Sequence, residues 1–331
     1  MKTIKINFCG FWGSFNKKDN LFTRILSRHF NVEISENPDF VICSNRGNPF
    51  EYMKYECVRL MFMGENMSPD YTVFDYCIGF DFMEFGDRYF RLPFAFYFDS
   101  GKPWIPEKLT EEQAWNIVKE KKYFCNFIYG HQSSHGMRER LFERLNEYKH
   151  VVSPGSYLNN MESQRKGTAK RCSWKEKNEY LKYSKFTIAG DSIHYPGFVT
   201  EKIVQPFMQH SIPVYFGSTR ISEEFNLESF VCCNDENDLE RVAEQVEFLD
   251  THDDAYVNML MKCPLHNQSY LVEKYEALEK FLVNIFEQEP KDAYRRVKYF
   301  AAESHESYLK EYAKRWEKTP KFVHEIKQRL Q

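Results

Sequence analysis

Two short stretches carry charged side chains at positions where a folded protein could use them for chemistry. In the first, Glu201 and Lys202 directly follow Thr200, a residue type that caps helices. In the second, Glu65 follows the apolar run 58–63 within a Gly-Glu-Asn turn. A lysine at a helix start can neutralise a phosphate group, and a carboxylate can accept hydrogen bonds from sugar hydroxyls or take up a proton.

The first pair lies inside a pattern of strand, turn, helix and strand. Residues 186–189 form an apolar run, Pro196-Gly197 is a turn signal, and residues 212–216 form a second apolar run. Between them, apolar residues recur at helical spacing after Thr200. The pattern predicts one βαβ unit, with the charged pair at the helix start, where open sheets bind nucleotides. The alternative is a capped surface helix with a solvated glutamate and lysine.

The sequence of residues 185–218 resembles the donor-binding motif of the alpha-1,3/4-fucosyltransferase family. That motif has a strand ending in Phe-Glu-Asn, a Tyr-Pro-Gly-Tyr or similar turn, Thr-Glu-Lys, a helix and an Ile-Pro-Ile-Tyr-Trp-Gly strand. The positions in register are Tyr195, Pro196, Gly197, Phe198, Thr200, Glu201, Lys202, Ile212, Pro213, Tyr215 and Gly217. The chain departs from the motif at Ala189-Gly190-Asp191, which stands where the family has Phe-Glu-Asn and places a carboxylate where the motif has an amide.

Two patches in the first third of the chain resemble the same family. Residues 64–93 look like its acceptor-domain signature, whose Gly-Glu-Asn glutamate corresponds to Glu65, and residues 6–26 form a third similar patch. The resemblance implies that Glu65 is the catalytic base; without it, the alternative is a turn glutamate in water. The acceptor-side candidates are Trp12, Asn66 and Asp81.

The resemblance implies an α/β protein of the GT-B type, with two Rossmann-like domains whose parallel sheets face each other across a cleft. It implies an inverting glycosyltransferase, an α1,3 (or α1,3/4)-fucosyltransferase that moves L-fucose from GDP-fucose to a hydroxyl of an N-acetylglucosamine-containing glycan. No metal and no cofactor beyond the donor substrate is expected. The donor-side candidates are Glu201, Lys202, Thr200, Tyr195, Asp191, Ser192, Arg138 and Asn159.

The departures on the donor side leave two alternatives open. Some family members place an arginine in the loop after Gly155-Ser156, where this chain has Leu158-Asn159-Asn160. The diphosphate would then rely on Lys202 or on a cation of the basic loop that follows, with the candidates Arg165, Lys166 and Arg171. A transferase that uses another nucleotide-activated sugar fits these changes, and so does a catalytically weak relative that binds nucleotide or glycan.

Strand and helix patterns alternate along most of the chain, which predicts parallel sheets in two domains. We expect an acceptor-binding domain at 1–115, a donor-binding domain at 116–290 and a helical tail at 291–331. The predicted strands are 3–11, 32–34, 40–43, 57–63, 75–80, 123–129, 151–152, 186–189, 212–216 and 230–233. The predicted helices are 21–30, a charged helix before 120, 136–148, the helix after Thr200, 238–249, 254–262 and 269–287.

The tail and the composition indicate which partners and which location to expect for this protein. Tail aromatics such as Tyr308 and Trp316 suggest an apolar stripe, which would pack back across the two domains or lie on a membrane surface. A net charge of −3 gives no broad basic field, so nucleic acid is not an expected partner. Nine scattered cysteines without metal-binding spacing indicate free thiols, and no leader or membrane span is recognisable. We expect a cytoplasmic protein, with peripheral contact at the inner membrane face as an option.

Overall fold

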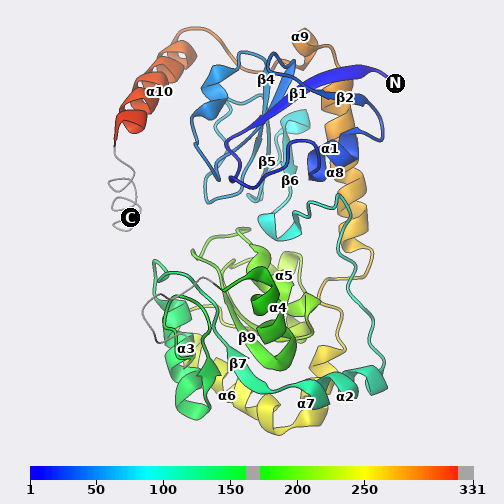
Figure 1. The fold of residues 1–331 in the computed structure, drawn as a ribbon, viewed down its shortest axis with the longest axis vertical. Helices are drawn as coiled ribbons and strands as arrows, with labels where there is room; N and C mark the ends of the chain where they lie inside the picture. Colours follow the sequence, from blue (N-terminus) through cyan, green and yellow to red (C-terminus); the bar gives the residue numbers. More distant parts are fainter. Residues whose placement is uncertain (162–171, 320–331) are drawn as a thin grey trace. The chain divides into compact units, whose positions relative to one another are not determined.

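A computed structural model describes residues 1–161 and 172–319. The chain divides into two compact units (Figure 1). The first unit contains residues 1–104 and the described residues from 272 onward, and the second contains residues 105–271. The boundary expected at 115 lies at 104, because Leu109 and Ala114 pack with Val257 of the second unit. The boundary expected at 290 lies at 271, because helix α8 (Tyr270–Glu287) lies almost wholly in the first unit.

Six strands form the described sheet of the first unit, in the order β2-β1-β3-β4-β5-β6, and each pairs parallel to its neighbours. Their bounds are β1 Thr3–Cys9, β2 Asn31–Ile34, β3 Phe40–Ser44, β4 Val58–Phe62, β5 Tyr76–Gly79 and β6 Tyr89–Arg91. Every residue of β3, β4 and β5 is buried, as expected for a parallel sheet that is covered on both faces.

Helices α1 (Leu21–Leu26) and α8 contribute apolar faces to the core of the first unit. The side chain of Asn20 caps α1 by accepting hydrogen bonds from the amides of Phe22 and Thr23. In α8, the ring of Phe286 lies 4.8 Å from that of Phe40 on β3, and Leu278 and Leu282 are fully buried. These contacts explain why α8 belongs to the first unit, although it follows the second unit in sequence.

Five strands form the described sheet of the second unit, also all parallel, in the order β11-β10-β9-β7-β8. Their bounds are β7 Tyr123–Asn126, β8 Val151–Val152, β9 Ser184–Gly190, β10 Ile212–Phe216 and β11 Val231–Cys232. The helices of this unit are α2 Glu111–Glu120, α3 Met137–Tyr148, α4 Trp174–Tyr183, α5 Glu201–Met208, α6 Leu239–Thr251 and α7 Asp253–Leu260.

Short 3-10 helices occur in both units. In the first unit they lie at Glu51–Lys54, Gly86–Arg88 and Phe94–Phe96, and in the second at Ile221–Glu223, Leu227–Ser229 and Glu236–Asp238.

The predicted βαβ unit is confirmed: β9, α5 and β10 follow one another, and β9 pairs parallel with β10. Among the strands and α-helices of the described residues, β6 and α4 were not predicted. Strand β6 has only three residues, and α4 is mostly polar, so neither carries a clear apolar period. The capping box at the start of α4, in which Ser173 and Glu176 bond each other's backbone amides, was the available signal.

All nine cysteines are free thiols. In the part of the chain that the structure describes, no helix is both long and apolar enough to span a bilayer. The expected cytoplasmic location, with peripheral contact at the inner membrane face as an option, stays a prediction.

The tail packs against the first unit through buried charges. Asp75 is fully buried and accepts hydrogen bonds from the amides of Arg295 (2.8 Å) and Arg296 (3.0 Å). The Arg296 guanidinium also forms an ion pair with Asp75 at 3.2 Å. On helix α10 (Ala301–Lys318), Glu306 pairs with the buried Arg59 at 3.0 Å. The tail contains helix α9 at Pro290–Ala293 as well.

The apolar stripe expected along the tail is divided in the structure. Tyr312 and Trp316 lie against Phe50, with ring centroids 5.6 and 6.1 Å away. By contrast, Phe300 is 90% exposed and Tyr308 is exposed as well. Part of the stripe therefore contacts Phe50 at the surface of the first unit, where Tyr312 is itself 44% exposed.

We predict that Asp75→Ala lowers the free energy of unfolding by roughly 3–5 kcal/mol, because it leaves the buried Arg296 without its counter-charge. Chemical denaturation of the full chain measures the loss. Asp87→Asn is the matched control: Asp87 also pairs with a tail arginine, Arg295, but at the surface, so a change within about 1 kcal/mol is expected. Equal losses in the two variants would contradict the role given to Asp75.

Candidate functional site

The motif residues of the second unit gather at the carboxyl ends of its central strands. The loop after β9 leads to the start of α5, and the loop after β10 begins at Gly217. The loop after β7 reaches the same edge, where the Tyr129 hydroxyl bonds the carbonyls of Ile188 (2.9 Å) and Gly190 (3.2 Å). This edge is where open α/β sheets bind their ligands.

Thr200 caps α5, which confirms the prediction. Its hydroxyl oxygen accepts a hydrogen bond from the Lys202 amide (3.5 Å) and another from Lys202 Nζ (3.2 Å). The same Nζ lies 3.7 Å from Oε1 of Glu201. The free amides and the dipole of the helix therefore lie together with an ammonium group and a carboxylate, an arrangement that suits a phosphate beside a hydroxyl-bearing group.

Asp191 lies beneath this site and is fully buried. The Thr200 hydroxyl donates to its Oδ1, and the Tyr215 hydroxyl donates to its Oδ2 at 2.8 Å. Burial raises the pKa of Asp191 to about 6, although Lys202 and the two hydroxyl donors oppose the shift. Asp191 was expected to contact the donor, and in the structure both its oxygens accept hydrogen bonds inside the protein.

The network of Asp191 continues into the neighbouring loops. The Ser218 amide donates to the Tyr215 hydroxyl at 2.8 Å, and the Gly197 amide donates to the Ser218 hydroxyl at 2.8 Å. Gly197 has a φ of +84°, which the Pro-Gly turn requires and which glycine adopts without strain. One chain of hydrogen bonds thus ties the turn before α5 to the end of β10.

Arg138, near the start of α3, is only 1% exposed. Its guanidinium lies over the Tyr129 ring, 4.1 Å from the centroid, and donates to the carbonyl of His131 at 3.1 Å. In the described part of the chain, its Nε has no hydrogen-bond partner. Gly190 leaves the space for this side chain, because a Cβ at position 190 would collide with Cγ of Arg138. A buried cation with an unused donor is suited to bind an anionic ligand.

Two histidines flank Phe216 at the same edge, and sequence reasoning did not single them out. The His135 and His194 rings lie 4.8 and 4.9 Å from the Phe216 ring. Burial, followed by the charge of Arg138, lowers the pKa of His135, so the neutral ring is favoured there. An isolated histidine in a loop carries no sequence signal that separates this role from a solvated one.

Lys177 on α4 is a second cation of this region that the sequence reasoning missed. Burial lowers its pKa, while its electrostatic partners include Glu201 and Lys202. Helices α4 and α5 pack together, which brings the two lysines to one side of the site. The helix itself was not predicted, so its lysine could not be placed.

The remaining donor-side candidates, Tyr195, Ser192 and Asn159, make different contacts in the structure. Tyr195 is 37% exposed in the turn before α5, and the carbonyl of Ser192 accepts a hydrogen bond from the Ser134 hydroxyl at 2.8 Å. Asn159 donates to the Gly155 carbonyl at 2.8 Å and accepts from the Met161 amide at 3.1 Å. Asn159 therefore shapes its own loop. The basic candidates Arg165, Lys166 and Arg171 lie outside the described residues.

In the first unit, Glu65 lies in the turn after β4, as predicted, and its side chain is 53% exposed. The Asn45 side chain accepts hydrogen bonds from the amides of Gly64 (3.0 Å) and Glu65 (3.1 Å). Arg46 pairs with Oε1 of Glu65 at 2.9 Å, and it lies over the Phe94 ring, 4.9 Å from the centroid. The loop after β3 therefore fixes the turn and one oxygen of the carboxylate.

The acceptor-side candidates lie in the first unit. Trp12 is half-buried and contacts the rings of Phe15 and Tyr97 edge-on, with centroids 5.3 and 5.7 Å away. Asn66 is exposed in the same turn as Glu65. The carbonyl of Asp81 accepts a hydrogen bond from the Tyr89 hydroxyl at 2.9 Å. Of these, Trp12 is the aromatic side chain, packed beside the rings of Phe15 and Tyr97, and an aromatic face can bind the apolar face of a sugar ring.

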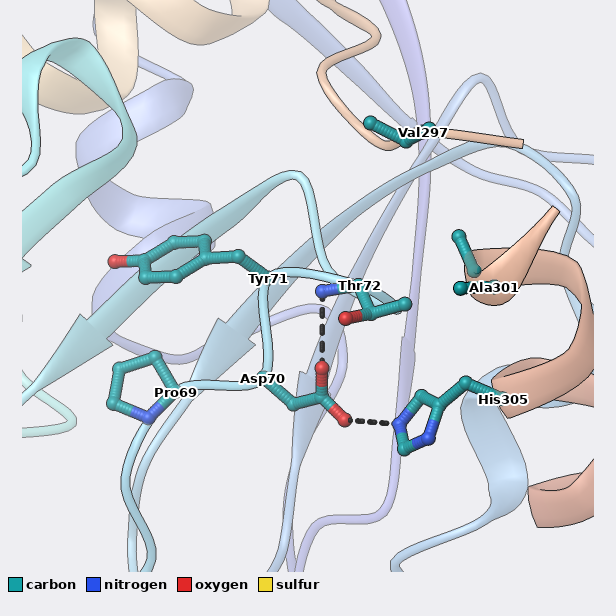
Figure 2. Close-up of a pocket in the computed structure, with 8 residues that line it drawn as sticks. Pro69, Asp70, Tyr71, Thr72, Val297, Ala301 and His305 are labelled. Atoms are coloured by element: carbon teal, nitrogen blue, oxygen red, sulfur yellow. Dashed lines mark hydrogen bonds and ion pairs between the residues drawn. The ribbon is translucent and has the colours of Figure 1, made fainter. Parts of the chain in front are cut away.

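A cavity of about 730 Å³ lies elsewhere in the first unit, between the loop 69–72 and the tail (Figure 2). Asp70 and His305 form an ion pair at its wall, 2.9 Å apart. Because β5 starts at Tyr76, this loop lies at the amino ends of the strands, whereas Glu65 follows the carboxyl end of β4. The cavity is therefore not the candidate site, in spite of its size.

Among residues 1–161 and 172–319, no group of three or more histidine, cysteine, aspartate or glutamate side chains has the geometry of a metal site.

Two family models match the chain. The N-terminal domain of alpha-(1,3)-fucosyltransferase FucT matches residues 6–98, and the C-terminal part of glycosyltransferase family 10 (fucosyltransferase) matches residues 118–262. Together they cover more than half of the chain. The first match includes Glu65, and the second includes the segment from Arg138 through Lys202.

Known relatives and structures agree with these matches. An alpha-(1,3)-fucosyltransferase FucT of Helicobacter pylori is 28% identical over 301 residues, which cover 80% of this chain and 60% of that protein. The chain thus spans less than two thirds of that relative's length. A crystal structure of alpha1,3-fucosyltransferase has a TM-score of 0.68 at 24% identity, with 86% of this chain and 90% of that chain covered.

A crystal structure of alpha1,3-fucosyltransferase with GDP-fucose has a TM-score of 0.63 at 25% identity, with coverage of 85% and 91%. The expected fold class, two Rossmann-like units of the GT-B type, is confirmed by these likenesses and by the two parallel sheets. Both family models, the curated relative and the shared fold agree, and the chain belongs to glycosyltransferase family 10, the fucosyltransferases.

Proposed function

We propose that this protein is an inverting α1,3 (or α1,3/4)-fucosyltransferase that moves L-fucose from GDP-fucose to a hydroxyl of an N-acetylglucosamine-containing glycan. The observation that carries the proposal is the start of α5, where Thr200, Glu201 and Lys202 lie together at the carboxyl end of β9. This arrangement lies in the segment that matches the family's C-terminal model. The similar alpha1,3-fucosyltransferase crystallised with GDP-fucose supports this choice of donor.

In the proposed donor complex, Lys202 and the free amides at the start of α5 bind the diphosphate. Nε of Arg138, which has no hydrogen-bond partner among residues 1–161 and 172–319, offers a further charged donor to a phosphate or to guanine. Lys177 adds positive charge nearby. Glu201 accepts hydrogen bonds from ribose hydroxyls, the role of acidic residues in dinucleotide folds. As the sugar–phosphate bond breaks, negative charge grows on GDP, and these fixed positive groups stabilise it.

Glu65 supplies the base in this mechanism. Its carboxylate takes the proton of an acceptor hydroxyl while that oxygen attacks the anomeric carbon of fucose from the face opposite GDP, which inverts the configuration. GDP leaves with the electron pair of the broken bond. Arg46 anchors Oε1 of Glu65, which leaves Oε2 available to the acceptor hydroxyl.

One observation favours a second candidate, a transferase for another nucleotide-activated sugar. Position 190 lacks a side chain where the family motif has a glutamate, and Asp191 is enclosed within the protein. Contacts from this element to the sugar therefore differ from those of the motif. A thermal-shift panel of GDP, UDP, GDP-fucose and GDP-mannose separates the two candidates, because at equal concentration the sugar nucleotide that binds more tightly gives the larger stabilisation, with GDP and UDP as references for the nucleotide alone.

Transfer itself is measured as GDP release from GDP-fucose with a mixed pool of galactose- and N-acetylglucosamine-containing acceptors. The anomeric configuration of the product, determined by NMR, tests inversion. GDP that binds normally without any release from GDP-fucose would favour a nucleotide- or glycan-binding relative over an enzyme.

We predict that Glu65→Gln lowers kcat by about 10²–10⁴-fold, since the amide cannot take the acceptor proton. GDP binding is expected to remain intact, because the donor residues lie in the second unit. Initial rates of GDP release and calorimetric GDP binding measure the two effects. Glu84→Gln, an exposed glutamate of the same signature segment, is the matched control and should leave kcat unchanged. A Glu65→Gln enzyme with the wild-type kcat would remove Glu65 from the base role.

We predict that Gly190→Ala weakens GDP-fucose binding by roughly tenfold, because the new methyl group displaces the Arg138 side chain from its place beside β9. The overpacking is expected to lower the free energy of unfolding by about 1–3 kcal/mol. Gly130→Ala is the matched control, since the nearest atom to its new Cβ, Oγ of Ser156, lies at an ordinary 3.6 Å. If Gly190→Ala binds GDP-fucose as the control does, Arg138 has no part in donor binding.

A further inference from the structure

The network around Asp191 has features that the proposed donor site alone does not require. Burying an ionised carboxylate costs free energy unless partners compensate for the lost water. Here two hydroxyl donors and the nearby Lys202 stabilise the ionised form of Asp191. We propose that Asp191 is a positioning residue that does not touch the donor: it holds Thr200 and Tyr215 in place and takes up a proton when a sugar nucleotide's diphosphate binds Lys202. This inference rests on the proposed function.

Geometry links the carboxyl group to the lysine through one atom. Oγ1 of Thr200 accepts a hydrogen bond from Lys202 Nζ at 3.2 Å and donates its own proton to Oδ1 of Asp191. When Nζ turns to a diphosphate, the Thr200 oxygen regains a lone pair. A protonated Asp191 can then donate to that oxygen, and the Thr200 hydroxyl proton becomes free for another acceptor. The carboxyl group gains one proton from solvent, and Tyr215 can still donate to its other oxygen.

The charges around Asp191 also favour proton uptake when a diphosphate binds Lys202. Without donor, the Lys202 ammonium group stabilises the ionised form of Asp191. A diphosphate engages that ammonium group and brings negative charge close to the carboxylate, and both effects favour the protonated form. The other titratable groups facing Asp191 are Glu201 on α5, Tyr215 on β10, Tyr129 after β7, and His135 with Arg138 at the start of α3.

The pH at which this exchange matters follows from the buried environment. The folded-state pKa of Asp191, about 6, lies above the usual aspartate value of about 3.9. Its contribution to stability is therefore fully present below pH 4 and is lost as the pH rises through 6. Donor binding raises this pKa further, so donor affinity should fall as the pH rises from 6 to 8.

Calorimetric titration of the full chain with GDP-fucose tests the inference, at pH 6, 7 and 8 and in buffers of different ionisation enthalpy. GDP-fucose is the suitable probe because neither of its phosphate groups titrates in this range. For the wild type we expect uptake of about half a proton per site near pH 7 and a dissociation constant that rises about tenfold from pH 6 to 8. For Asp191→Asn, which keeps the shape but carries no charge, we expect no proton uptake from this site and a dissociation constant independent of pH.

Tyr215→Phe is the second variant and serves if Asp191→Asn does not fold. It removes a hydrogen bond to the charged form of Asp191, so the pH dependence of GDP-fucose binding should move to higher pH. His135→Gln and His194→Gln should retain the proton uptake, and its loss in either would assign the titration to that histidine instead. Binding without proton uptake in the wild type overturns this inference alone, whereas no binding of GDP-fucose at all overturns the proposed function.

Discussion

The strands of each described sheet run parallel, and this constraint decides where chemistry can lie in both units. In a parallel sheet every strand ends at the same edge, so loops that are distant in sequence meet there. The turn with Glu65 follows β4 in the first unit, and the start of α5 follows β9 in the second. The cavity between the loop 69–72 and the tail lies at the other edge of the first sheet, which explains why its size does not make it the active site.

Two buried aspartates show how enclosed charge organises the units. Asp75 accepts hydrogen bonds from three backbone amides, those of Arg59, Arg295 and Arg296, and its carboxylate pairs with the Arg296 guanidinium. It therefore joins the tail to the first sheet. Asp191 accepts two hydroxyl groups and holds the segment that carries Lys202. The partners differ in kind: a permanent guanidinium pairs with Asp75, whereas Asp191 depends on neutral donors and a lysine that the proposed donor recruits. The first arrangement suits a fixed joint, and the second suits a site that responds to ligand.

Local patterns predicted much of the fold and part of the site. Strand β10 was predicted at residues 212–216 and has those bounds, because apolar β-branched residues flanked by turn signals favour a buried strand. Thr200 was predicted as a cap, and hydroxyl capping depends only on neighbouring residues. Helix α4 was not predicted, because its face is polar and its stability depends on packing against other elements. The boundary expected at 290 was wrong for this reason: α8 packs in the first unit through contacts with residues that are distant in sequence, such as Phe40.

The sequence by itself determined the identity of the charged groups, the alternation of strands and helices, and the turns that place Glu65 and the Glu201-Lys202 pair at strand ends, since these depend on local spacing. Only the tertiary structure decided that Asp191 is enclosed and that the Asn159 side chain bonds its own loop. It also decided that Arg138 is buried, with an Nε that has no hydrogen-bond partner in the described part of the chain. The physical reason is that burial and hydrogen-bond partners arise from residues far apart in the chain. The environment of a carboxylate or guanidinium, and hence its chemistry, follows from those partners.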